Sequence, residues 1–138
     1  MTIEIDFYNK YGKLTELSHS YLSLINLVID QEKMDCKSVT VIWVNDADLA
    51  KLHADFLDDP SKTDVMTFDL GDEQIEAEIY ISVDRAIEQA KQFKVDLSNE
   101  LSRLVVHGLL HLAGYDDHTD TDIKAMRQRE EHFLKQIN

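Results

Sequence analysis

Residues 75–83 read Ile75-Glu76-Ala77-Glu78-Ile79-Tyr80-Ile81-Ser82-Val83, which is the clearest strand pattern in the chain. Apolar and polar side chains alternate along it, so the two sets point to opposite faces of a sheet. A second β-type run at 65–68 precedes it, and Gly71-Asp72 between the two runs is typical of a hairpin turn. The sequence therefore predicts two neighbouring strands joined as a hairpin.

The sequence before this hairpin predicts two more strands and two helices. Alternation at 3–7 predicts a half-buried strand, and the β-branched and aromatic run at 39–44 predicts a strand buried on both faces. Helical spacing from Leu14 to Val28 predicts a helix between these strands. Asn45 is the expected N-cap of a second helix. The predicted inward residues of that helix are Leu49, Leu52 and Phe56.

Helical patterns follow the hairpin at 84–93, 98–112 and about 120–136. Thr119 followed by Asp122 has the spacing of a capping box at the start of the last helix. The complete order β-α-β-α-β-β-α-α-α predicts an α+β fold, in which a small mixed sheet of about four strands packs with about five helices. The inward residues of the last helix are predicted to be Ile123, Met126, Phe133, Leu134 and Ile137.

The composition predicts one soluble domain over residues 1–138. Hydrophobic residues make up 43% of the chain and charged residues 30%, a balance that can bury a core. The apolar runs are too short to span a bilayer, and residues 1–6 lack the pattern of a signal peptide. Cys36 is the single cysteine, which excludes a disulfide within the chain and favours a reducing compartment. We therefore expect a cytoplasmic protein.

The charge balance is strongly acidic. Asp and Glu number 27 against 14 Lys and Arg, for a formal net charge of −13. This balance argues against a protein that coats nucleic acid non-specifically, because phosphate binding relies on excess Lys and Arg. The acidic balance still allows an enzyme that binds a single phosphodiester group through a bound cation.

Three of the six histidines lie close together in the sequence: His107, His111 and His118. The first two are four residues apart on an expected helix, so they project from one face about 40° apart. Gly114 is a natural helix stop, after which the chain can turn back and bring His118 to the same ion. Three protein ligands and an open position are typical of a catalytic zinc. By spacing alone, a metal site and a chance surface cluster explain the pattern about equally well.

Gly108 separates this pattern from the common zinc proteases. Those enzymes carry their general-base Glu directly after the first histidine, where this chain has Gly108. Glycine inside a helix also costs about 1 kcal/mol relative to alanine. Such a cost predicts a packing reason for a glycine at this position.

The stretch His107-Gly108-Leu109-Leu110-His111-Leu112-Ala113-Gly114-Tyr115-Asp116-Asp117-His118 closely resembles the H-G-x-L-H-L-x-G-Y-D-H signature of the YbeY family. That family comprises bacterial metal-dependent endoribonucleases, also called rRNA maturation factors. Residues 63–68 resemble its T-[DN]-V-L-S-F strand, and residues 78–82 resemble its G-D-I-x-I-S strand. Glu100 sits where the family often has Glu, so the resemblance covers most of the domain.

The resemblance implies a zinc-dependent endoribonuclease specific for single-stranded RNA, acting in 16S rRNA 3′-end maturation and ribosome quality control. It implies one Zn²⁺ per chain, held on a C-terminal helix and the following loop by His107, His111 and His118. It also implies rRNA and the ribosome or ribosome-associated proteins as partners, with no membrane and no DNA. The catalytic residues stay open.

The chain departs from the family pattern at three places. Asp117 is an extra residue before the last histidine and occupies the usual position of the third ligand. We expect His118 to be the ligand because a loop can absorb one residue, and Asp117 is the alternative. Ala77-Glu78 replaces the family's G-D, and Leu57 stands where the family commonly has an Arg thought to help with phosphate or catalysis.

Two further functions are compatible with these residues. One is a metallohydrolase of peptides or other esters, and the other is a non-catalytic ribosome-assembly factor stabilised by its metal, which Leu57 favours. Candidate stacking platforms for exposed bases are Tyr115 and Tyr80. Arg103, four residues before His107, either faces the metal or pairs with Glu100 or Glu88. The basic residues expected to flank a cleft are Lys62, Arg85, Arg103 and Lys124.

Overall fold

The computed structural model describes residues 3–12, 21–57 and 63–137. Four strands and five helices in these ranges follow the predicted order. The strands are β1 (Glu4–Asn9), β2 (Cys36–Val44), β3 (Val65–Asp69) and β4 (Ile75–Ser82). The helices are α1 (Leu22–Gln31), α2 (Asp46–Leu57), α3 (Val83–Phe93), α4 (Leu97–Leu112) and α5 (Asp120–Ile137). The α+β prediction is confirmed, although residues 14–20 of the first predicted helix lie outside the described ranges.

The four strands form one mixed sheet in the order β1-β2-β4-β3. β1 and β4 each pair with β2 in parallel, whereas β3 pairs with β4 antiparallel, which confirms the predicted hairpin. In this register Thr67 of β3 lies opposite Ile79 of β4. The hairpin therefore forms one side of the sheet, with β3 as an edge strand.

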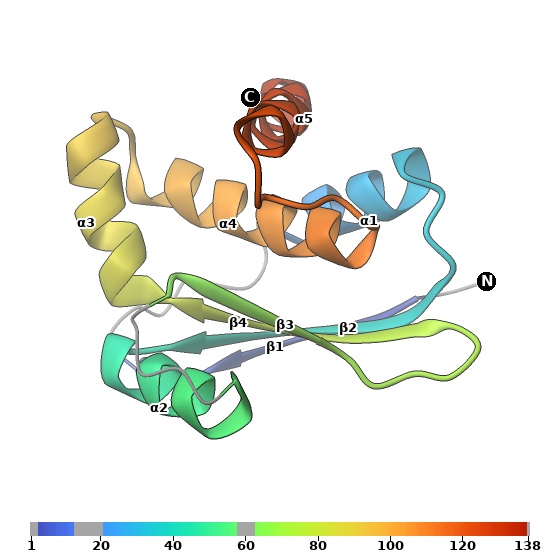
Figure 1. Ribbon diagram of the computed structural model, residues 1–138, viewed down its shortest axis with the longest axis horizontal. Helices are drawn as coiled ribbons and strands as arrows, with labels where there is room; N and C mark the ends of the chain where they lie inside the picture. The colour runs from blue at the N-terminus through green and yellow to red at the C-terminus, as the bar shows by residue number, and fades with distance from the viewer. Residues whose placement is uncertain (1–2, 13–20, 58–62, 138) are drawn as a thin grey trace.

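The helices cover the two faces of the sheet unequally (Figure 1). α4 packs on β3 and β4, with α1 beside it and α5 against its outer side, whereas α2 packs on the opposite face. The predicted alternation of β4 is confirmed, because Ala77, Ile79 and Ile81 are buried in the core shared with α4. A smaller apolar cluster lies under α2 and contains Ile42, Val44, Leu49 and Met66.

Gly108 lets α4 approach the sheet closely. A Cβ atom built at this position would lie 2.9 Å from Cγ2 of Ile79 and 3.2 Å from Cγ2 of Thr67. Both distances are shorter than ordinary van der Waals contact, so a larger residue would push the helix away from the hairpin. The predicted packing reason for this glycine is confirmed.

The predicted N-terminal caps of two helices are present. The backbone N–H of Asp48 donates to Oδ1 of Asn45 at 2.7 Å, which caps α2. At the start of α5, the N–H of Asp122 donates to Oγ1 of Thr119 at 3.0 Å, and the N–H of Thr119 donates back to Oδ2 of Asp122 at 3.4 Å. This reciprocal pair is the capping box expected from the spacing.

The prediction that Phe56, Ile123 and Ile137 face inward is wrong. Phe56 is 66% exposed, Ile123 is 43% exposed and Ile137 is 41% exposed. Phe56 lies near the end of α2, where its ring packs against Phe68 on the edge strand, with 5.3 Å between ring centroids. Ile137 is the last residue of its helix. The remaining predicted inward residues, Leu49, Met126, Phe133 and Leu134, are buried, and Leu52 is partly buried.

No helix in the described part of the chain combines the length and apolar character needed to cross a bilayer.

Candidate metal centre

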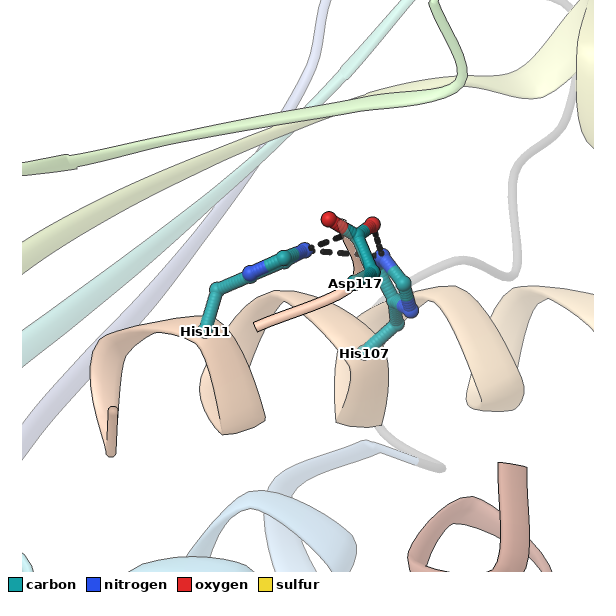
Figure 2. Close-up of side chains that lie close together, drawn as sticks. All are labelled: His107, His111 and Asp117. Carbon is teal, nitrogen blue, oxygen red and sulfur yellow. Dashed lines mark hydrogen bonds and ion pairs between the residues drawn. The ribbon is translucent and has the colours of Figure 1, made fainter. Parts of the chain in front are cut away.

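Two histidines on α4 and an aspartate from the next loop point their side chains at one another (Figure 2). Nε2 of His107 lies 3.0 Å from Nε2 of His111. Oδ2 of Asp117 lies 3.3 Å from Nε2 of His111 and 3.6 Å from Nε2 of His107. Ligand atoms about 2.0–2.1 Å from a tetrahedral zinc are about 3.3–3.4 Å apart. The three separations, 3.0, 3.3 and 3.6 Å, span that value, so the group fits a single ion of this size.

His107 is oriented by a buried carboxylate on another helix. Its Nδ1 lies 2.8 Å from Oε2 of Glu130 on α5, and Glu130 is only 1% exposed. An ionised carboxylate only accepts hydrogen bonds, so Nδ1 carries the proton and Nε2 presents its lone pair to the group. A carboxylate behind a ligating histidine is the usual way in which proteins fix the ring of a metal ligand.

His111 is oriented by the backbone of the loop that follows its helix. Its Nδ1 lies 3.1 Å from the carbonyl oxygen of Tyr115, which is also only an acceptor. In the neutral imidazole Nε2 is then the nitrogen without a proton, and it faces the group. Both imidazoles are thus prepared to bind a cation through the same type of nitrogen.

Glu130 is held in turn by a guanidinium. Arg103 donates from Nη1 to Oε1 of Glu130 at 3.1 Å and from Nη2 to Oε2 of Glu100 at 2.6 Å. Burial alone would lower the pKa of Arg103, but the hydrogen bonds and charges of Glu100 and Glu130 outweigh it and raise the pKa. Both carboxylates are buried, so this cation compensates two charges that are removed from water.

The loop that carries Asp117 is fixed at its start. Gly114 has a φ of +107°, and the N–H of Tyr115 donates to the carbonyl of Leu110 at 2.9 Å, which ends α4 as predicted. The side chain of Tyr115 is hydrogen-bonded to Glu32, which raises the pKa of the tyrosine hydroxyl. Glu32 also forms an ion pair with Arg129 at 2.8 Å. Tyr115 therefore anchors the loop between α1 and α5.

The described residues bring Asp117, and not His118, together with the two histidines of α4. His118 is exposed and follows Asp117 directly in the loop. The third ligand predicted from the sequence is His118, whereas the residue that lies beside the two histidines is Asp117, one position earlier. For His118 to take this place, the loop before it would have to accommodate one more residue. The start of the loop is already fixed at Gly114 and Tyr115, and Asp117 is the residue that reaches the group.

The other predicted site residues lie at various distances from the group. Tyr80 packs in the apolar cluster under α2, on the sheet face opposite α4, and its hydroxyl donates to Glu78 at 3.0 Å. Arg85 pairs with Asp46 at 3.3 Å, and Lys124 is exposed on α5. Leu57 is the last residue of α2, and Lys62 lies outside the described residues. Among the predicted cations that the structure describes, Arg103 is the one linked to the histidines, through Glu130.

Sequence reasoning missed Glu130, although a signal for it existed. Glu130 lies four residues after Met126 and three before Phe133, which places it on the buried stripe of α5. An acidic residue on an apolar stripe is expected to have a partner, because burying an unpaired carboxylate is costly. Its two partners, Arg103 and His107, are both on α4 and one turn apart.

Comparison with known proteins adds independent information. The sequence model of a family described as Endoribonuclease YbeY matches residues 4–138. A protein of that name from Flavobacterium psychrophilum is 39% identical over 118 residues, which cover 84% of each chain. Another from Christiangramia forsetii is 31% identical over 133 residues, which cover 95% of this chain and 92% of the relative.

Solved structures include one of similar fold. The solution structure of TM1509 from Thermotoga maritima superposes with a TM-score of 0.66 and 28% sequence identity. The superposition covers 99% of this chain and 89% of that one. With a family match that begins at residue 4 and ends at residue 138, the chain belongs to the Endoribonuclease YbeY family.

Proposed function

We propose that the protein is a metal-dependent endoribonuclease that cleaves single-stranded RNA. The observation that carries this proposal is the convergence of Nε2 of His107, Nε2 of His111 and Oδ2 of Asp117 within one ion's coordination shell. The names of the curated relatives supply the substrate class. Together they favour hydrolysis of an RNA phosphodiester over the other reactions that a metal of this kind supports.

The proposed ligands are His107, His111 and Asp117, with His118 as the alternative for the third position. Two imidazoles and one carboxylate are a donor set that suits zinc and leaves one position open for water or substrate. When bound, such an ion polarises a phosphoryl oxygen and lowers the pKa of a coordinated water. An aspartate ligand would reduce the net charge of the site from +2 to +1, which still opposes the charge of the surrounding protein.

The residues of the chain itself contribute orientation. Glu130 and the carbonyl of Tyr115 keep both histidines in the tautomer that binds a cation. Asp117 is more exposed than either histidine, so the open side of the group faces the solvent on the side of the loop. A substrate phosphate therefore has access from this side.

We further propose that the RNA is rRNA, in 16S 3′-end maturation and ribosome quality control, and that the protein works on the ribosome. The net charge of −13 supports this location, because repulsion slows the approach of free RNA to an acidic protein. Contact with a ribosomal or ribosome-associated protein would hold the enzyme beside its substrate without needing a basic surface.

The test compares substrates under one set of conditions. Zinc-loaded protein is incubated with single-stranded RNA, the same RNA as a duplex, and casein. We expect cleavage of the single strand alone, with loss of activity on chelation and in His111→Ala. Intact RNA together with digested casein would reassign the protein to the peptidases. If every substrate stays intact while ribosome binding persists, the non-catalytic assembly role suggested by Leu57 is correct.

A further inference from the structure

A cavity of about 260 Å³ adjoins the candidate metal centre on the side of α3 and α5. His107 and Asp117, two of the three proposed ligands, also line this cavity. A group that enters it is therefore a direct neighbour of anything held at the metal centre. The rest of the wall then determines what kind of group that is.

The wall offers an exposed aromatic ring and an exposed aliphatic side chain. Phe93, the last residue of α3, is 48% exposed, and Ile123 on α5 is 43% exposed. Ile123 was expected to face inward, and its place beside this cavity accounts for an apolar residue at an exposed position. Large apolar side chains grouped on the surface beside a catalytic site commonly mark a binding surface.

The wall also carries a cation that is not already neutralised. Arg127 is exposed, and its guanidinium carbon lies 5.7 Å from the centroid of the Phe93 ring. Arg127 forms no ion pair with any described residue, whereas Arg103 on the same wall is paired with Glu100 and Glu130. The guanidinium carbon of Arg103 also lies over the Phe93 ring, 5.9 Å from its centroid. A nucleobase that stacks on the ring takes the place of the exposed Arg127 guanidinium, which can then contact a backbone phosphate.

We propose that this cavity receives the base of a nucleotide next to the cleaved phosphate, with the base stacked on Phe93 and the backbone contacted by Arg127. This inference rests on the proposed endoribonuclease function and names a subsite for its substrate. It gives a physical reason for single-strand preference, since a base must leave its helix to enter the cavity. A paired and stacked base in a duplex cannot reach the ring.

The polar part of the wall predicts weak discrimination among bases. The amide of Gln89 is engaged at both ends, since Nε2 donates to Asp64 at 3.3 Å and Oε1 accepts from Arg103 at 3.4 Å. Each end of the amide therefore already has one partner, which holds its orientation and limits its capacity to read the hydrogen-bonding edge of a base. Recognition then depends on stacking, which tolerates every base.

The experiment measures RNA binding by the zinc-loaded full-length protein with a fluorescein-labelled six-nucleotide adenosine RNA. Fluorescence anisotropy gives Kd, with readings taken before measurable cleavage. Phe93→Ala and Phe93→Leu should each weaken binding about 5- to 100-fold, and Phe93→Trp should restore it, because stacking needs a ring and not merely an apolar side chain. The matched control is Phe56→Ala, an exposed phenylalanine under the opposite face of the sheet, which should bind as the wild type does.

The contribution of Arg127 has its own signature. Arg127→Ala should reduce the slope of log K against log salt by about 0.7, the value for one phosphate contact to a single strand. Lys135→Ala, an exposed cation further along α5, should leave that slope unchanged. Zinc content measured on every variant confirms that the metal centre is intact.

Equal Kd values for wild type, Phe93→Ala and Phe93→Leu would overturn the base site, even if the wild type cleaves RNA. Equal weakening by Phe93→Trp and Phe93→Ala would also overturn it, because a stacking role requires rescue by another aromatic ring. The proposed endoribonuclease function is decided separately, by whether the wild type cleaves the single strand. The two proposals therefore fail in different measurements.

Discussion

Nδ1 of His107 and Oε2 of Glu130 lie 2.8 Å apart, although 23 positions of sequence and two different helices separate them. The carboxylate is buried, and its other oxygen accepts from Arg103. One side chain therefore joins the candidate metal centre to the ion-pair network between α4 and α5.

Replacing the carboxylate should weaken metal binding without removing a proposed ligand. Glu130→Gln keeps the shape of the side chain but loses the charge that holds the proton on Nδ1 of His107. We expect zinc affinity to fall about 10- to 100-fold, the usual effect of losing a partner behind a ligating histidine. Competition with a chromogenic chelator measures this change. Glu131→Gln, its exposed neighbour on α5, is the matched control and should bind zinc as the wild type does.

The identity of the third ligand can be decided with a pair of variants. Because Oδ2 of Asp117 lies 3.3 Å from Nε2 of His111, Asp117→Ala should lose most of its zinc. His118→Ala should retain close to one zinc per chain by elemental analysis. The opposite pattern would establish His118 as the ligand that the sequence predicted. Full retention in both variants would mean that the two histidines of α4 bind the ion without either residue.

Arg103 should be more important for stability than any exposed cation. Arg103→Ala would leave Glu100 and Glu130 buried together without their shared partner, a change that typically costs about 3–5 kcal/mol. Urea unfolding followed by circular dichroism measures the loss. Lys124→Ala on the exposed side of α5 is expected to change the unfolding free energy by less than about 0.5 kcal/mol. A similarly small effect at Arg103 would show that the network contributes little.

Gly108→Ala should destabilise the protein even though alanine is the better helix former. The added Cβ would meet Ile79 and Thr67 at distances that a packed core does not tolerate. Overpacking costs about 1–3 kcal/mol, which exceeds the gain of about 1 kcal/mol in helix propensity over most of that range. Ser98→Ala, an exposed position in the first turn of α4, tests propensity alone and should be close to neutral. An increase in the unfolding free energy of Gly108→Ala would contradict the close-approach argument.

Tyr21 should make stability fall at alkaline pH. Burial raises the pKa of Tyr21 from 10.0 to about 12, so the folded state holds this proton more tightly than the unfolded state. The stabilising contribution is complete below pH 10, decreases between pH 10 and 12, and is lost above that range. Between pH 9 and 11 the wild type should lose about 1.3 kcal/mol more than Tyr21→Phe, whose ring does not titrate. Parallel losses in the two proteins would show that another group is responsible.

The sequence predicted the elements of the fold well because each carries a local signal. Alternation along β4, the Gly71-Asp72 turn and the cap at Asn45 depend on neighbours in the chain, and the structure contains all three. The inward face of a helix is less local. Phe56 and Ile123 have the correct period, but whether they are covered depends on where the neighbouring elements end.

The candidate site was predictable in part for the same reason. His107 and His111 share a helix, so their proximity follows from helical geometry alone. The third position depends on the path of a loop, which is set by the left-handed Gly114 and by the contact of Tyr115 with Glu32. Glu32 follows α1 and is therefore distant from Tyr115 along the chain, so its contact with the loop cannot be derived from sequence spacing.

The hydrogen bond between His107 and Glu130 couples cation binding at the candidate metal centre to docking of the C-terminal helix. A cation at Nε2 of His107 strengthens the hydrogen bond that Nδ1 donates to α5, so occupancy of the site favours the docked helix. By the symmetry of coupled equilibria, the docked helix raises the affinity for the cation by the same factor. Amide hydrogen exchange in α5 should therefore slow when zinc is added, so the exchange rate of the C-terminal helix reports whether the candidate metal centre is occupied.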